Sequence, residues 1–342
     1  MKRLVCLSAL VVMVLVLVAG GCGPKEPEKF TIKMNTALDP PWREDMGKNP
    51  LAWTLEWFCA TVNERTQGQV EFEIYWLSEL GVQGTEDLRA VRDGLLDVTA
   101  SPDGYIAGDI PELMIANQLL LMDASEYQLI APKIEPILDK TLTEKWGVVP
   151  IAYWPGEEQI LNSIKPMDSV DDFAGIKLRG WAPSHVELAN SLGASPVSIT
   201  MAELYVAYQR GIADAIITSL GTYINLKLYE VGKYFNTIPL NSALIFVYFN
   251  EDAFNSLPEN IQEIIFEVAE ESSQFHLGTA MPGYYEIYDR AIPDFGMINV
   301  DFPPEELEKI RAIAPAIWEE WASSNGPTAQ ELLRLARETL GR

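Results

Sequence analysis

The stretch that decides the fold spans residues 176–217 and runs IKLRGWAPSHVELANSLGASPVSITMAELYVAYQRGIADAII. Two amphipathic segments in it separate three short apolar runs, at 176–179, 196–199 and 213–217. Each segment ends at a glycine, Gly193 or Gly211, the residue that most often terminates a helix. Short apolar runs that alternate with helices are typical of parallel strands joined by helical crossovers. The stretch therefore predicts an α/β fold with a parallel sheet and helices on both faces.

The same pattern occurs nearer the N-terminus. Periodicity predicts strands at 30–34, 70–76 and 95–100, and helices at 51–62 and 85–93. The segments 88–97 and 204–214 each combine a helix, the spacing Gly-x-x-Asp and an apolar strand. As a repeat they predict two similar lobes with a cleft between them. Coincidence is the alternative, because a glycine ends the helix before a strand in many α/β proteins.

Local signals refine this outline. Thr200 and Glu203 have capping-box spacing, which predicts that their side chains satisfy free amides at the start of a helix. Another strand is expected at 244–249, and the remainder from 258 to 340 is expected to be mainly helical. Pro282 and Pro315 should kink or break those helices.

The first residues have the pattern of an export signal. Two basic residues precede an apolar run at 4–18, and Ala19-Gly20-Gly21-Cys22 follows as a small-residue cleavage site. A cysteine after small residues resembles the bacterial site at which the thiol is diacylated. We therefore expect a signal peptide at 1–21, lipidation of Cys22 and a polar tether at 22–29. Cleavage without lipidation is the alternative.

Length and charge limit the function. The first 21 residues carry two basic and no acidic side chains, which leaves 321 residues with 23 basic and 49 acidic side chains, a net charge of −26. This length suits two lobes better than one core. The charge repels nucleic acid and anionic lipid headgroups, so both are excluded as partners. An anionic ligand would need a specific buried cation. Cys59 is expected to be a buried thiol, and no internal disulfide is possible.

Motifs for catalysis are missing. The chain has no G-x-S-x-G elbow, no phosphate-binding glycine loop and no C-x-x-C. Its two histidines, His185 and His276, have no cysteine or second histidine at metal-ligand spacing, and we expect both to be structural or exposed. The chain is therefore not expected to be an enzyme. No cofactor is expected, although a metal bridging ligand and protein stays open.

Several motifs in order resemble one family. They are ATVNERTQGQV at 60–70, VRDGLLD at 91–97, DFAGIKLR at 172–179, LGASPV at 192–197 and QRGIAD at 209–214. This set is similar to the solute-binding subunit of TRAP (tripartite ATP-independent periplasmic) transporters, the DctP family. The resemblance implies a two-lobed periplasmic binding protein fold with crossing strands, a long bridging helix and a helical C-terminal segment. It implies lobe I at 30–154 and 244–283, lobe II at 155–243 and 284–311, and C-terminal helices at 312–342 that pack across the lobes.

The resemblance also implies a ligand anchor. Arg179 matches the family arginine that forms a salt bridge with the ligand's carboxylate. A planar guanidinium offers two parallel donors to a carboxylate and stays charged. A structural salt bridge with one of the 49 acidic residues is the alternative.

Two positions depart from the family pattern. Glu158 stands where many relatives carry a second arginine, and Thr218 stands where relatives that bind sialic or dicarboxylic acids often have asparagine. Both changes favour a monocarboxylate with an apolar or hydroxylated body over a compact dicarboxylate. Glu158 would accept from a hydroxyl or ammonium group, or would lie solvated at the edge of the cleft.

Aromatic residues supply candidates for the rest of the pocket. Trp154 lies at the expected crossing between lobes, and Trp181 follows Arg179 by two residues. Tyr105 and Tyr223 follow the strands of the two similar units. Strand ends face the cleft in such folds, although any one of these residues could instead belong to the core.

Together the residues and the resemblance predict a binding module. We expect an exported, lipid-anchored monomer at the periplasmic face of the cell envelope. It would capture a small organic acid and deliver it to two integral membrane subunits driven by an ion gradient. A receptor for an ATP-driven importer or a sensor kinase is one alternative. A periplasmic hydrolase or lyase is another, and it would need a titratable group of shifted pKa near the ligand.

Overall fold

The computed structural model describes residues 28–38, 40, 42–43 and 47–342. The expected signal peptide, the lipidation site Cys22 and most of the tether lie outside these residues. The strands are β1 (Phe30–Thr36), β2 (Trp42–Arg43), β3 (Gly47–Lys48), β4 (Val70–Tyr75), β5 (Val98–Pro102), β6 (Val148–Ser163), β7 (Lys177–Arg179), β8 (Ser195–Val197), β9 (Ala215–Thr218), β10 (Tyr234–Phe235), β11 (Asn241–Asn250) and β12 (Ile298–Asn299). The α-helices are α1 (Pro50–Arg65), α2 (Asp87–Arg92), α3 (Asp103–Ile106), α4 (Ala124–Trp146), α5 (Pro183–Ser191), α6 (Leu204–Gln209), α7 (Leu220–Asn225), α8 (Glu251–Asn255), α9 (Glu259–Phe275), α10 (Met281–Phe295), α11 (Pro304–Ser324) and α12 (Gly326–Leu340).

The main sheet is mixed, in the order β4-β1-β5-β11-β6-β9-β7-β8, with β10 and β12 off this path. The strands β4, β1 and β5 are parallel, and so are β9, β7 and β8. Between them, β11 and β6 run antiparallel to their neighbours. The prediction of a parallel sheet is therefore correct for each half and wrong for the centre. We call the half built on β4, β1 and β5 lobe I, and the half built on β9, β7 and β8 lobe II.

Both halves contain the same local arrangement, a glycine at a helix end followed three residues later by an aspartate. This supports the predicted similarity of the segments 88–97 and 204–214. Gly94 and Gly211 both adopt left-handed backbone angles at a helix end, with φ of 71° and 67°. The aspartate three residues later then accepts a hydrogen bond from a backbone N–H of the neighbouring strand. Asp97 binds the Lys33 backbone N–H at 2.8 Å, and Asp214 binds the backbone N–H of Lys177 at 2.8 Å.

Three local predictions need correction. The strand expected at 95–100 begins at Val98, because the Leu95 backbone N–H still bonds to the carbonyl of Ala90 and caps α2. The Thr200 side chain makes no helix-capping hydrogen bond, since its hydroxyl donates to the Glu203 carboxylate at 2.8 Å. Pro315 lies inside α11, so the helix is not broken there, and the alternative of a kink stays a prediction.

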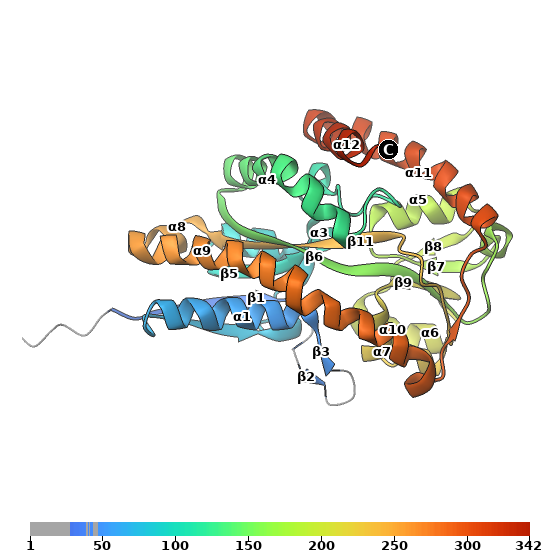
Figure 1. Cartoon of the computed structure of the whole chain (residues 1–342), viewed down its shortest axis with the longest axis horizontal. Helices are drawn as coiled ribbons and strands as arrows, with labels where there is room; N and C mark the ends of the chain where they lie inside the picture. The colour runs from blue at the N-terminus through green and yellow to red at the C-terminus, as the bar shows by residue number, and fades with distance from the viewer. Residues whose placement is uncertain (1–27, 39, 41, 44–46) are drawn as a thin grey trace, which may run out of the picture.

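One long helical element spans both halves (Figure 1). It consists of α9, a π-helical turn at His276–Ala280 and α10, and it packs on α1 and β6 at one end and on α7 at the other. His276 fixes the turn because its ring contacts Thr54 Oγ1 at 2.8 Å and the Pro155 carbonyl at 2.7 Å. Since a carbonyl only accepts, Nε2 carries the proton there. Pro282 lies in the first turn of α10, two residues after Ala280, and the helical element is disrupted beside it by the π-helical insertion.

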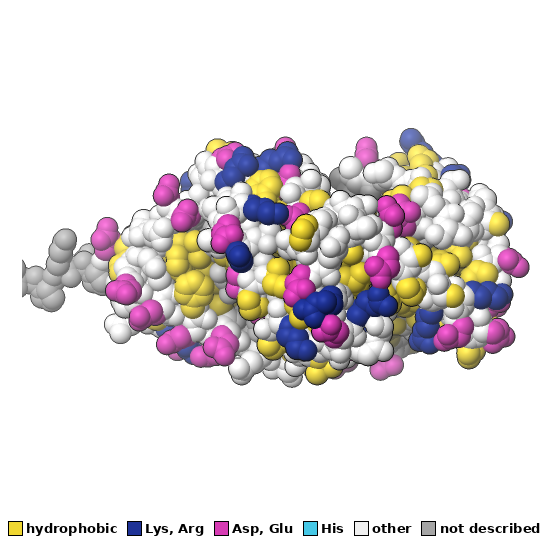
Figure 2. Space-filling model, turned by 90° about the horizontal axis from the view of Figure 1, so that it is seen from above, with side chains coloured by type: hydrophobic (Ala, Val, Ile, Leu, Met, Phe, Trp, Pro, Cys, Tyr) yellow, Lys and Arg dark blue, Asp and Glu magenta, His cyan; other side chains and the backbone are white. Residues whose placement is uncertain are grey.

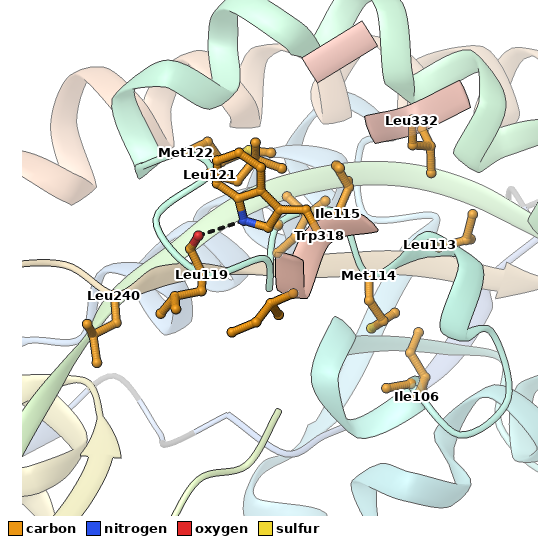
Figure 3. Close-up of a cluster of buried hydrophobic side chains, with 14 of the residues drawn as sticks. Ile106, Leu113, Met114, Ile115, Leu119, Leu121, Met122, Leu240, Trp318 and Leu332 are labelled. Atoms are coloured by element: carbon orange, nitrogen blue, oxygen red, sulfur yellow. Dashed lines mark hydrogen bonds between the residues drawn. The ribbon is translucent and has the colours of Figure 1, made fainter. Parts of the chain in front are cut away.

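The C-terminal helices pack on both halves. The helix α12 lies against α4, and α11 lies against α5 of lobe II. Trp318 of α11 is inserted among apolar side chains, where its indole N–H donates to the Leu119 carbonyl at 2.7 Å (Figure 3). The core is therefore continuous beneath these helices. The lobe boundaries given above stay a prediction.

The surface agrees with the composition. On the face in Figure 2, acidic and basic side chains are interspersed and neither histidine is visible. Cys59 is buried as predicted, and burial raises the pKa of its thiol. Among the described residues, no helix has the length and apolar character needed to cross a membrane.

Candidate functional site

Arg179 is the centre of the site and lies at the last position of β7. Its side chain is buried, with only 3% of the residue exposed. Nε and Nη2 both donate to the carbonyl of Ile199 at 3.3 Å, and Nη2 lies 3.6 Å from the sulfur of Met201. The remaining nitrogen, Nη1, is buried and has no hydrogen-bond partner.

No acidic side chain of residues 28–38, 40, 42–43 and 47–342 forms an ion pair with Arg179. The ion pairs in this part of the chain all involve other residues. Burial accordingly lowers the pKa of the guanidinium. A buried charge without a counter-ion costs several kcal/mol. The alternative of a structural salt bridge is not supported, and the arrangement can accept an anion at Nη1.

Trp181 and Tyr105 lie close to this arginine. Tyr105 is in α3 of lobe I and interacts electrostatically with Arg179. The rings of Tyr105 and Trp181 are 6.5 Å apart, with an edge-to-face tilt of 62°. Gly180 lets the chain turn here, because a Cβ at this position would lie 2.3 Å from the Cβ of His185. The structure therefore brings together three of the predicted site residues.

Gln159 of β6 completes this side of the site, and sequence reasoning missed it. Gln159 Oε1 accepts the indole N–H of Trp181 at 2.8 Å, and its amide donates to the Glu157 carbonyl at 2.7 Å. Alternation along a strand places these two residues on one face and Glu158 on the other. The sequence did point to this part of β6 through Glu157-Glu158, but the prediction chose Glu158, one residue away from Gln159.

A buried polar network lies behind Trp181. His185 Nδ1 accepts the Trp181 backbone N–H at 3.3 Å, so Nε2 carries the proton and donates to Asn241 Oδ1 at 2.7 Å. Burial, assisted by the positive charge of Arg179, lowers the pKa of His185 to about 4. Asn241 in turn donates to Asn117 Oδ1 at 3.3 Å. His185 is therefore neutral and structural, as predicted.

Asp103 is a second buried ionisable group near this network. Burial raises its pKa to about 7, although hydrogen bonds from Leu244, Asn117 and Gly104 oppose the shift. One oxygen, Oδ1, accepts the Gly104 backbone N–H at 2.9 Å. This carboxyl group therefore titrates near neutral pH, directly beside Tyr105.

The other predicted site residues lie elsewhere. Trp154 is fully buried in the core of lobe I, with its indole N–H donated to Ser272 at 3.0 Å. Tyr223 is fully buried in the core of lobe II, where its hydroxyl bonds to the Gly232 carbonyl at 2.9 Å. We therefore leave both out of the proposed site, and their ligand contact stays an untested prediction.

Thr218 and Glu158 are also separate from the aromatic pair. Thr218 is buried at the end of β9, and its backbone carbonyl accepts from Asn162 at 3.3 Å. Glu158 accepts from the Tyr285 hydroxyl at 3.2 Å, and burial raises the pKa of its carboxyl. Glu158 is thus neither solvated nor in contact with Trp181.

A pocket of about 250 Å³ lies where α1, β6, α7 and α10 meet. Its lining residues are Pro40, Asn49, Pro50, Trp53, Glu157, Gly221, Asn225, Ala280, Gly283, Tyr284, Glu286, Ile287 and Arg290. Arg179 is not among them. Within the described residues, no group of three or more His, Cys, Asp or Glu side chains is placed to hold a metal ion.

Known proteins share this architecture. Residues 47–325 match the family described as bacterial extracellular solute-binding protein, family 7. A solute-binding protein of Albidiferax ferrireducens is 30% identical over 294 residues, which cover 83% of this chain and 84% of that protein.

Two solved structures are also similar. One is a TRAP periplasmic solute-binding protein of Desulfovibrio salexigens with bound orotic acid, at 27% identity and a TM-score of 0.82, covering 92% of this chain and 99% of the other. The second is a TRAP periplasmic solute-binding protein of Rhodoferax ferrireducens with bound malonate, at 26% identity and a TM-score of 0.79, covering 91% and 98%. Both are two-lobed receptors rather than catalysts.

Proposed function

The chain belongs to family 7 of the bacterial extracellular solute-binding proteins, and we propose that it holds a small organic acid through Arg179. It is a TRAP-type binding receptor of the periplasm and not an enzyme. The finer assignment concerns the ligand, the group that holds it and the route of delivery.

One observation carries the proposal. Arg179 is buried, has no acidic partner in the described residues and keeps one nitrogen without a hydrogen-bond partner. A ligand carboxylate would supply the missing counter-ion and form a charge-assisted hydrogen bond to Nη1. The free energy gained is large because the pair forms away from water.

The surroundings of Arg179 favour one class of acid. Tyr105 and Trp181 provide flat apolar surface, and Met201 adds a polarisable thioether. The described hydrogen-bond partners of Arg179 are the Ile199 carbonyl and the Met201 sulfur, and neither could pair with a second carboxylate. We infer a monocarboxylate with a ring or a hydroxylated body. Of the ligands bound by the two relatives above, orotate fits this description better than malonate.

Delivery completes the proposed role. The lobes would close over the acid, and the closed protein would dock on two integral membrane subunits driven by an ion gradient. Lipid on Cys22 would keep the receptor, as a monomer, at the outer face of the membrane. Its net negative charge opposes capture of anions at long range, so specificity must come from the buried cation.

A thermal-shift titration tests the carboxylate. Orotate, malonate and pyroglutamate are compared with methyl orotate, in which the carboxylate is blocked. A ligand at one hundred times its Kd stabilises a protein by about 2.7 kcal/mol. Orotate or pyroglutamate should raise Tm, and the ester should not. An equal shift with orotate and its ester, or no shift with any acid, would refute the proposal.

A further inference from the structure

Trp181 makes an unusually close contact with Gly104. A Cβ built on Gly104 would lie 1.9 Å from Cζ3 and 2.3 Å from Cε3 of the Trp181 ring. Because such contacts below 3.0 Å do not occur in folded proteins, the indole rests directly on the glycine backbone. Only glycine leaves room for the ring in this position.

Both sides of the contact are fixed. The indole N–H of Trp181 donates to Gln159, and its backbone N–H donates to His185. The backbone N–H of Gly104 donates to the buried carboxyl group of Asp103. The ring and the glycine therefore meet as two rigid surfaces.

The contact joins the two lobes beside the proposed anchor. Gly104 belongs to α3, which follows β5 of lobe I, and Trp181 follows β7 of lobe II. The crossing strands β11 and β6 separate β5 from the lobe II strands in the sheet. Arg179 lies two residues before Trp181, and Tyr105 lies directly after Gly104. When the indole meets the glycine, Tyr105 of lobe I and Arg179 of lobe II are brought together.

We propose that Trp181 and Gly104 form a latch that holds the lobes together and positions Arg179 for the ligand. The inference rests on the proposed function, because it concerns closure around the same site. It also assigns Trp181 a role other than donating a hydrogen bond to the ligand, since Gln159 already accepts the indole N–H. Trp181 and Gly104 are positioning residues, one in each lobe.

Gly104→Ala tests the latch with a single methyl group. The ring would have to withdraw by more than 1 Å to relieve the contact. The backbone of Gly104 is not left-handed, so alanine is tolerated by the fold. Gly108→Ala is the matched control, because it adds the same methyl four residues later with no atom within 4 Å.

Affinity for orotate and pyroglutamate is measured by calorimetry, and closure by the radius of gyration from small-angle X-ray scattering. Gly104→Ala should weaken binding about ten-fold or more and keep the radius larger than that of the wild type. Gly108→Ala should match the wild type in both. Far-UV circular dichroism without ligand should be the same for all three proteins, which shows that each of them is folded. A Gly104→Ala protein that binds and closes like the wild type would overturn the latch.

A double variant shows whether Gly104→Ala acts through the Trp181 ring or only on its own surroundings. With Trp181→Ala already present, Gly104→Ala should change affinity by less than about two-fold, because the ring it would displace is gone. An equal loss in both backgrounds would overturn the pairing of the two residues. If the wild type binds neither acid, the carboxylate proposal fails separately, and scattering without ligand decides the latch. The wild type should then be more compact than Gly104→Ala, and equal radii would refute it.

Discussion

Replacing Arg179 by methionine should weaken acid binding and at the same time stabilise the ligand-free protein. The two effects have opposite signs because the guanidinium is buried without a counter-ion. If Arg179 were a structural residue, its replacement would weaken acid binding and also destabilise the ligand-free protein.

The magnitudes follow from its contacts. Removing one member of a buried charge pair costs about 2–5 kcal/mol, so affinity for the acid should fall roughly 30- to 4,000-fold. In the ligand-free protein the side chain makes only two hydrogen bonds of 3.3 Å to one carbonyl and a contact to sulfur. Replacing a buried ion pair by well-packed apolar groups of similar volume is neutral or stabilises proteins by about 1–4 kcal/mol. We expect about 1 kcal/mol here, or about 2 °C in Tm, because the Ile199 carbonyl loses its donor.

Two controls accompany the variant. Arg210→Met removes an exposed arginine and should change neither affinity nor Tm. Arg179→Lys keeps the charge without the planar fork and should lose less affinity than methionine. Calorimetry with orotate and pyroglutamate gives the affinity, and urea unfolding without ligand gives the stability. A loss of affinity below three-fold, or a loss of more than 1 kcal/mol in unfolding free energy, would show that Arg179 is a structural residue.

Three further predictions concern other parts of the molecule. The folded-state pKa of Asp103, about 7, lies above the ordinary pKa of an aspartate, about 3.9, so the protonated carboxyl stabilises the fold and this contribution is lost as pH rises from about 4 to 7. The stability advantage of Asp103→Asn over the wild type should therefore grow with pH by up to about 1.4 kcal/mol per unit in urea unfolding, and a constant difference would contradict the raised pKa. Trp318→Phe should cost about 1–3 kcal/mol, because the buried Leu119 carbonyl loses its donor, whereas the same change at the less buried Trp321 should cost less in the same assay. Cys22→Ala should move the protein from the membrane fraction to the soluble fraction, and unchanged retention on fractionation would rule out the lipid anchor.

Local patterns were sufficient to predict most elements. The Gly-x-x-Asp spacing at 94–97 and 211–214 corresponds to a real device, in which glycine ends a helix and aspartate binds the next strand. The strand alternation at 30–34 and 70–76 also predicted β1 and β4 correctly. The helix ends and the strand alternation depend on residues close in sequence, which is why periodicity reveals them, whereas the partners of the two aspartates lie 64 and 37 residues away.

The site was harder to predict because strands buried on both faces give no sign of which face meets the cleft. Trp154 lies in the middle of β6 and Tyr223 lies in α7, after β9, and both point into cores. A shift of one residue along β6 exchanges Glu158 for Glu157 and Gln159, since neighbouring side chains point to opposite faces. The contact between Gly104 and Trp181 joins positions 77 residues apart, and no local pattern encodes it.

The order of strands in the sheet constrains how the protein is made. The strand β5 pairs with β11, in which Ile245 lies opposite Pro102, 143 residues earlier in the chain. Until β11 has been synthesised, β5 has no partner on the side that faces the middle of the sheet, and β6 lacks its longest partner. Lobe I therefore cannot fold completely during synthesis until β11 has been made. Such late, distant pairing slows folding and favours a chain that stays unfolded until nearly all of it has been delivered. Delayed folding would suit the proposed export of the chain across a membrane.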